Sequence, residues 1–184
     1  MNGEELLRRY EAGERNFRQV NLSQAILHNA YLPEINLERA ILTEADLTGA
    51  NLERAILSQA SLELANLSKA NLTEANLTGA NLTEALMYQT SLGKANLQRA
   101  NLSQGILQRI FLREANLTQA ILFGANLEQA NLTDVNLTQA DLRETNLEAA
   151  FLMKANLFQA DLEGANVHRA ILTGAIAPDG SIYK

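Results

Sequence analysis

Between residues 65 and 84 the sequence reads ANLSK-ANLTE-ANLTG-ANLTE, four copies of one five-residue unit. The unit continues in both directions, because every fifth residue from Leu22 to Leu172 is Leu except at Met87 and Val167. Ala stands two positions before this residue in 24 of the 31 units, and Asn, Asp or Ser lies between them in 21. The chain is therefore a tandem array of A-(N/D)-L-x-x repeats, with Phe17 as a first Leu equivalent.

This spacing decides which backbone buries the Leu residues. In an α-helix a step of five residues turns the side chain by about 140°, so successive Leu would spread around the axis. In a straight strand an odd step would send successive Leu to opposite faces. The pattern is satisfied when Ala and Leu point inward from a short extended piece and the two variable residues form a corner. The repeat therefore predicts a β-solenoid, a chain that coils around a Leu core.

The signature, as in Ala70-Asn71-Leu72-Thr73-Glu74, resembles that of the pentapeptide-repeat family over residues 16 to 176. The resemblance implies an all-β fold, a right-handed quadrilateral β-helix of about eight coils with four repeats per coil. At about 4.8 Å per layer the rod would be about 38 Å long. The periodicity alone leaves the number of repeats per coil open, and the outward Ile26, Ile41 and Ile56 hint at three. The resemblance also implies a bacterial origin, since such repeats are especially numerous in cyanobacteria.

The central Asn residues are expected to be structural. Each would lie above another in the next coil, where their amides can hydrogen-bond along the stack as in layered β-structures. N-L-S and N-L-T triplets such as Asn21-Leu22-Ser23 are then by-products of the repeat and not glycosylation sites.

The two ends of a solenoid need covers. Residues 3 to 12 predict a short capping helix, with acidic residues early, Arg8 and Arg9 late, and Gly13 as a stop. We therefore divide the chain into an N-terminal helical cap (1–15), a β-solenoid (16–176) and a C-terminal turn and tail (177–184). The tail, with Ile182 and Tyr183 folded back, is a thin cover, so a homodimer through the C-terminal end is a further expectation.

The composition argues against several functions. A net charge of −6 disfavours direct nucleic acid binding, and the absence of Cys excludes disulfides and thiol chemistry. The only histidines, His28 and His168, are too far apart along a rod to share a site. No phosphate loop or metal motif is present, so we expect no enzyme, no cofactor and no metal. The start of the sequence has no secretory pattern and no apolar run is long enough for a membrane span, which favours the cytoplasm.

The surface is more informative. With four repeats per coil, the side that carries Leu22, Leu42 and every twentieth residue after them gathers seven acidic residues against Arg143 alone. This acidic side is the candidate partner-binding surface, and its carboxylates are Glu44, Glu63, Glu84, Asp141, Glu144, Asp161 and Glu163. It has a neutral gap at Gln104 and Phe123-Gly124. The candidate apolar contacts are Leu64, Tyr88, Phe123, Met153 and Phe158.

Two functions fit these features. The first is a rigid scaffold for protein-protein interaction or regulation, with an unidentified protein partner and no membrane. One cyanobacterial relative of this kind regulates cell differentiation through regulatory proteins. The alternative is a partial DNA mimic that binds a type II topoisomerase such as DNA gyrase, as some members of the family do. Duplex DNA carries about one charge per 1.7 Å, so a full mimic of this length would need about 22, far more than the acidic side provides.

Overall fold

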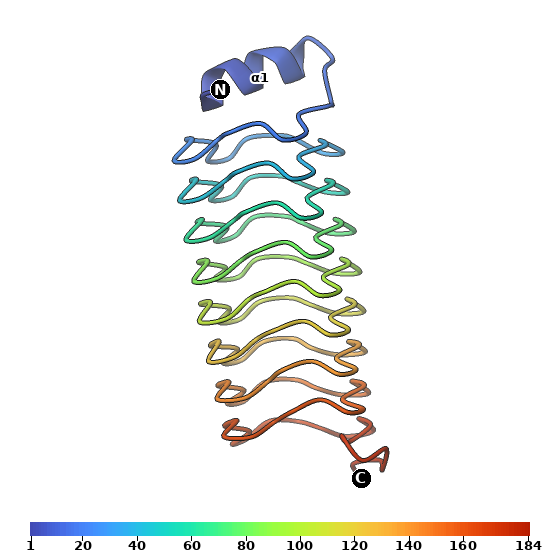
Figure 1. The fold of residues 1–184 in the computed structure, drawn as a ribbon. Helices are drawn as coiled ribbons and strands as arrows, with labels where there is room; N and C mark the ends of the chain where they lie inside the picture. Colours follow the sequence, from blue (N-terminus) through green and yellow to red (C-terminus); the bar gives the residue numbers. More distant parts are fainter.

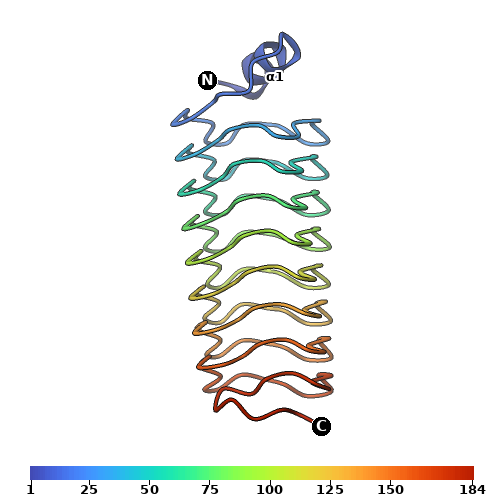
Figure 2. The ribbon, with the colours of Figure 1, turned by 90° about the vertical axis from the view of Figure 1, so that its right-hand side faces the viewer.

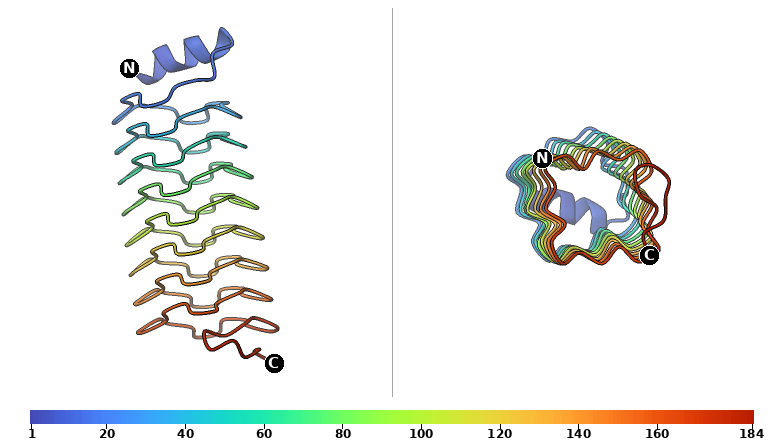
Figure 3. Two further views of the ribbon diagram at one scale, coloured as in Figure 1. Left: turned by 45° about the vertical axis from the view of Figure 1, so that its right-hand side comes forward. Right: turned by 90° about the horizontal axis from the view of Figure 1, so that it is seen from below.

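The computed structural model describes residues 1–184 as one straight rod of stacked coils (Figures 1 and 2). Its only helix, α1 (Gly3–Glu11), lies across the N-terminal end. Apart from one antiparallel bridge in the C-terminal tail, all other regular structure consists of single-residue parallel bridges that join residues 20 apart, from Asn16–Asn36 to Asn156–Ile176. Four repeats therefore make one coil, which excludes the spacing of three, and residues 17–176 form eight coils. Seen from the end, the coils superpose on a four-sided outline (Figure 3).

A left-handed backbone at the corner bends each repeat. Every fifth residue from Gln19 to Gly174 has a positive φ, and most of these residues are not glycine. The amide of the following Ala donates to the carbonyl of the preceding Leu, as Ala25 N does to Leu22 O at 3.0 Å. Because the same turn recurs at a fixed interval, the chain bends by the same amount each time and winds into a coil.

Three backbone hydrogen bonds per repeat join neighbouring coils. Leu62 N donates to Asn81 O at 2.6 Å, Leu64 N donates to Thr83 O at 3.0 Å, and Asn81 N donates back to Ala60 O at 2.9 Å. Leu and Ala side chains make up most of one continuous cluster of 57 buried residues along the axis. Ala predominates at the second inward position, where Ile35, Ile110 and Val135 are also buried.

The central Asn residues act mainly within their own repeat. Asn71 Oδ1 accepts from the backbone N–H of Thr73 at 3.0 Å and from its hydroxyl at 2.7 Å. This N–H is the one backbone donor of the repeat that has no partner in another turn or coil, so the Asn satisfies it. The expected amide stack forms only along Asn126, Asn146 and Asn166, at 3.2 and 3.1 Å. The prediction of a general ladder was wrong, because the local N–H is the nearer donor.

The cap covers the first coil as the sequence predicts. Asn2 caps α1 by accepting from Glu5 N at 2.9 Å, and Leu6 and Tyr10 are buried over Phe17. Two groups of the cap bond to carbonyls on the rim of the first coil. The Met1 amino group donates to Asn21 O at 3.1 Å, and the Tyr10 hydroxyl donates to Pro33 O at 2.7 Å.

The C-terminal tail folds back over one part of the last coil. Ile182 pairs antiparallel with Ile176, and Tyr183 exchanges hydrogen bonds of 2.9 Å with Gly174 and Ala175. The rest of this end is open, because Leu162 and Leu172 are only half-buried and Val167 is 43% exposed.

The corner geometry predicts opposite effects for two neighbouring alanines. Ala149 has a φ of 54°, where a Cβ is unfavourable, whereas Ala150 is fully buried and points inward. We expect Ala149→Gly to raise the free energy of unfolding by about 0.5–1 kcal/mol. Ala150→Gly should lower it by about 1 kcal/mol, since it removes a packed methyl group. Urea denaturation of both variants tests this, and a loss of stability in Ala149→Gly would contradict it.

Candidate functional site

The acidic side forms two groups in the structure. All seven carboxylates lie at outward or corner positions of the same side, and five of them are exposed, while Glu63 and Asp141 are half-buried. Glu44, Glu63 and Glu84 lie in the N-terminal half and form the upper acidic group. Asp141, Glu144, Asp161 and Glu163 lie in the last two coils and form the lower acidic group. Gln104, Phe123 and Gly124 separate the two, as the sequence predicts, so the acidic side is not a continuous strip.

The upper acidic group is hydrogen-bonded to neutral side chains. Gln24 donates to Glu44 at 2.9 Å, and Asn81 donates to Glu63 at 2.5 Å. Each bond joins two neighbouring coils without neutralising the charge. Leu64, which is 48% exposed, occupies the corner position in the coil between Glu44 and Glu84. This group therefore combines uncompensated acidic charge with one apolar side chain.

The lower acidic group surrounds Arg143. The guanidinium binds both oxygens of Asp141, with Nε–Oδ1 at 2.9 Å and Nη2–Oδ2 at 2.7 Å, and lies 3.7 Å from Asp161. It also lies over the ring of Phe123, 5.7 Å from its centroid. Hydrogen bonding to Arg143 lowers the pKa of Asp141, and the same bond raises the pKa of Arg143. Four carboxylates against one guanidinium leave this end of the acidic side negative.

The corner column on the opposite side of the rod, half a coil further along the chain, carries charges of both signs instead. Reading every twentieth residue from Glu34 gives Arg54, Glu74, Lys94, Glu114, Asp134 and Lys154. Arg54 lies 3.5 Å from Glu34 and 3.1 Å from Glu74, and Lys94 lies 3.9 Å from Glu114. These pairs are exposed and each contributes little to stability. The signs alternate from Glu34 to Glu114, and Asp134 then repeats the negative sign, which leaves the whole column nearly neutral.

The structure brings no catalytic set of residues together. His28 and His168 lie on the same side of the rod in the first and last coils. No three His, Cys, Asp or Glu side chains are grouped so as to hold a metal ion. No helix has the length and apolar character that crossing a bilayer requires. Three hollows lie at the ends of the rod, two of about 670 and 460 Å³ beside α1 and one of about 280 Å³ in the C-terminal end.

The apolar contact candidates are only partly as expected. Leu64, Phe123, Met153 and Phe158 are exposed, whereas Tyr88 is half-buried beside Arg109. Sequence reasoning did not select Ile26 and Tyr31, which are 67% and 70% exposed, more than any apolar side chain elsewhere in the coils. The available signal was their place in the first coil, where no coil lies above them.

This architecture is similar to that of proteins of known family and structure. The family model described as pentapeptide repeats matches in several overlapping segments between residues 21 and 174. A solved structure of HetL, a pentapeptide repeat protein involved in heterocyst differentiation regulation from the cyanobacterium Nostoc sp. strain PCC 7120, is 34% identical over 100% of both chains, with a TM-score of 0.46. No curated protein matches the chain.

Two further solved structures are less similar to this chain in sequence. QnrB1, a plasmid-mediated fluoroquinolone resistance protein, is 18% identical over 86% of this chain and 72% of its own, with a TM-score of 0.66. Rfr23, a pentapeptide repeat protein from the cyanobacterium Cyanothece 51142, is 23% identical over 91% and 97%, with a TM-score of 0.31.

These features define a class, the right-handed quadrilateral β-helix built from five-residue repeats. The chain belongs to the pentapeptide-repeat family. The resemblance read from the repeats is thus confirmed.

The Asp141–Arg143 pair predicts a pH dependence of stability. A carboxyl whose folded-state pKa is lowered contributes stability above its ordinary pKa of about 3.9 and loses it as the pH falls through the lower value. We therefore expect Asp141→Asn to be less stable than the unaltered protein at pH 7, and the two melting temperatures to converge towards pH 2. Arg143→Gln should show the same convergence, with little further loss in the double variant. A difference independent of pH would contradict the assignment.

Proposed function

We propose that this protein is a non-catalytic scaffold that holds a cytoplasmic partner protein against the acidic side of its rod. The lower acidic group carries the proposal, because it places Asp141, Glu144, Asp161 and Glu163 on two adjacent coils next to the exposed ring of Phe123. Charged residues around an aromatic side chain on a convex surface suit a protein partner better than a small molecule, which needs a concave pocket. The likeness to HetL supports a regulatory role.

The construction of the rod favours binding of this kind. Each corner residue before the last coil is fixed by a backbone hydrogen bond to the next coil, as Glu144 N is bonded to Glu163 O at 2.9 Å. A surface whose backbone is already ordered loses less conformational entropy when a partner binds. The partner would therefore meet carboxylates presented at a regular spacing of one coil.

The alternative, a partial DNA mimic that binds a type II topoisomerase, has less support. The acidic side is interrupted at Gln104, Phe123 and Gly124, and the column from Glu34 to Lys154 carries charges of both signs. The likeness to QnrB1 concerns the fold alone. Neither the number nor the continuity of the charges approaches that of duplex DNA.

Charge reversal tests the acidic side. We expect Glu144→Lys with Glu163→Lys to abolish capture of the partner from native lysate at physiological salt, because it replaces two carboxylates of the lower acidic group with ammonium groups. Glu128→Lys with Glu148→Lys is the matched control, as it makes the same change of charge on the adjacent side in nearby coils. Equal capture by both double variants would exclude the acidic side. Inhibition of gyrase supercoiling at micromolar protein, lost in the first variant only, would favour the DNA mimic instead.

The C-terminal end favours self-association through unpaired backbone groups. In the preceding coil Leu142, Leu147 and Leu152 each donate an N–H to the last coil at 2.8 Å. The corresponding N–H groups of Leu162, Val167 and Leu172 have no partner in the chain. The hollow between them is lined only by apolar side chains: Leu147, Leu152, Leu157, Leu162, Ala165, Val167, Leu172 and Tyr183.

We therefore propose a homodimer through this end. The tail covers one part of the C-terminal end and leaves the rest open. A two-fold axis perpendicular to the rod can therefore place the tail of one copy over the open part of its partner. Light scattering after gel filtration should give a dimer mass that Val167→Lys reduces to the monomer mass. Ile106→Lys, an equally exposed position on the same side of the rod, should leave the dimer intact. A monomer at all concentrations would exclude this proposal without affecting the acidic side.

A further inference from the structure

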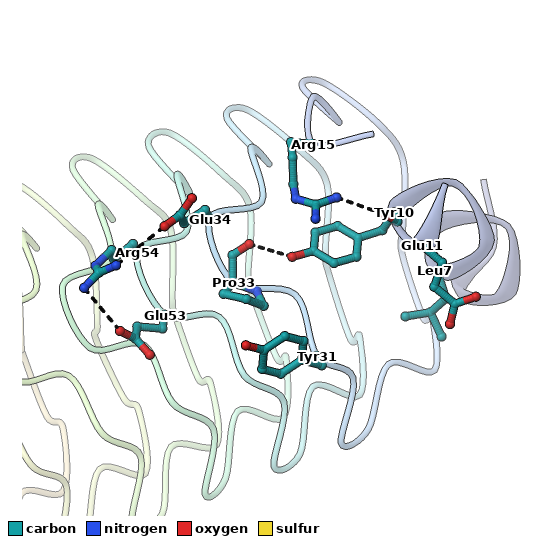
Figure 4. Close-up of a pocket in the computed structure, with 9 residues that line it drawn as sticks. All are labelled: Leu7, Tyr10, Glu11, Arg15, Tyr31, Pro33, Glu34, Glu53 and Arg54. Atoms are coloured by element: carbon teal, nitrogen blue, oxygen red, sulfur yellow. Dashed lines mark hydrogen bonds and ion pairs between the residues drawn. The ribbon is translucent and has the colours of Figure 1, made fainter. Parts of the chain in front are cut away.

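A groove runs between α1 and the first coils at the N-terminal end. It has a volume of about 670 Å³ and is open to solvent along one side of the rod. The helix contributes Leu7, Tyr10 and Glu11, and the coils contribute Tyr31, Pro33, Glu34, Glu53 and Arg54, with Arg15 in the connection (Figure 4). The two tyrosines enter this space from different elements, Tyr10 from the helix and Tyr31 from the coil (Figure 4).

The rim of the groove is an open strand edge at Tyr31. In the coil below, Asn51 N donates to Ala30 O and Asn51 O accepts from Leu32 N, both at 2.8 Å. Tyr31 occupies the same position one coil earlier, bridged to Asn51, but neither its N–H nor its C=O has a partner in the chain. The cap replaces the missing coil only at Asn21 O and Pro33 O. An extended segment could therefore pair with Tyr31 as an added strand.

The same residue exposes the largest aromatic surface of the rod. Tyr31 is 70% exposed, whereas Phe111 and Phe151, at the same position in later coils, are 48% and 40% exposed. Most repeats place Asn, Asp or Ser here, so solvent exposure alone does not explain an aromatic ring. Leu7 of the helix, half-buried, adds apolar surface on the opposite wall. An apolar side chain of a bound segment would be covered on both sides.

The groove carries a net negative charge, because Glu11, Glu34 and Glu53 outnumber Arg15 and Arg54. Arg54 is already held by Glu34, Glu53 and Glu74, at 3.5, 3.7 and 3.1 Å. Arg15 stacks on the Tyr10 ring at 3.8 Å and donates to Tyr10 O at 2.8 Å. The carboxylate of Glu11, in contrast, is exposed and has no partner in the chain, and it lies at the C-terminal end of α1, where the helix dipole also favours cations.

We propose that this groove binds an extended segment of a partner protein in which basic and apolar side chains alternate. The segment pairs with the N–H and C=O of Tyr31, places an apolar side chain between the Tyr31 ring and Leu7, and directs a Lys or Arg towards Glu11. The groove lies at the opposite end of the rod from the lower acidic group, so this site is additional to the proposed scaffold function and independent of it.

Two short peptides test the site on the full-length protein. We expect acetyl-KVRVK-amide to cause saturable chemical-shift changes in the ¹⁵N-labelled protein, largest at the amides of Tyr31 and Leu32 and at the end of α1. Acetyl-EVEVE-amide should cause none there. Tyr31→Asn and Glu11→Gln should each weaken the affinity at least about fivefold, through loss of apolar contact and of charge respectively.

Phe111→Asn is the matched control, because Phe111 holds the same position in the repeat but both its backbone groups are paired. It should leave the affinity unchanged. Equal binding of the acidic peptide, shifts absent from Tyr31, or an equal loss in Phe111→Asn would overturn the proposal. Glu11→Gln changes only an exposed carboxylate, so a failure of Tyr31→Asn to fold would still leave a decisive variant. None of these outcomes bears on partner capture by the acidic side.

Discussion

The left-handed corner residue is the constraint on which the rest of this rod depends. A positive φ at every fifth position, from Gln19 to Gly174, gives each repeat the same turn. Equal turns bring each central residue above its counterpart 20 residues later, which aligns the N–H and C=O groups of neighbouring coils. The same alignment stacks Leu on Leu along the axis, so the corner geometry determines both the hydrogen bonding and the core.

In a solenoid of this kind the backbone N–H and C=O groups along the sides are paired, whereas many of those at the two ends lack partners. Along the sides each coil receives the hydrogen bonds of its neighbours, and exposed variable residues change little in the fold. At the ends one layer of partners is missing. The Met1 amino group and the Tyr10 hydroxyl replace two of them at the N-terminus, and the tail near Tyr183 replaces some at the C-terminus. The remaining open groups include those of Tyr31 and Val167, with which the proposed additional chains would pair.

The sequence predicted the coil well because its determinants are local and repeated. The Leu spacing excluded helices and straight strands, and the resemblance supplied four repeats per coil, which Ile26, Ile41 and Ile56 alone would have obscured. The function of Asn was harder to predict, since the choice between Thr73 N and a neighbouring amide depends on backbone geometry that composition does not contain. The exposure of Tyr31 was also missed, because its repeat looks ordinary and only the absence of a coil above it makes it different.

The stacking of one coil on the next also determines which charges of the rod are paired and which are not. A step of 20 residues stacks side chains one layer apart, so like charges in register repel unless their sign alternates or a counter-charge intervenes. The column that begins at Glu34 alternates as far as Glu114, and its charges are paired over that stretch. On the acidic side Asp141 lies directly above Asp161, and Arg143 compensates only one of the two fully. The fold could have neutralised this side in the same way, and its retained negative charge is the feature on which the proposed partner-binding role rests.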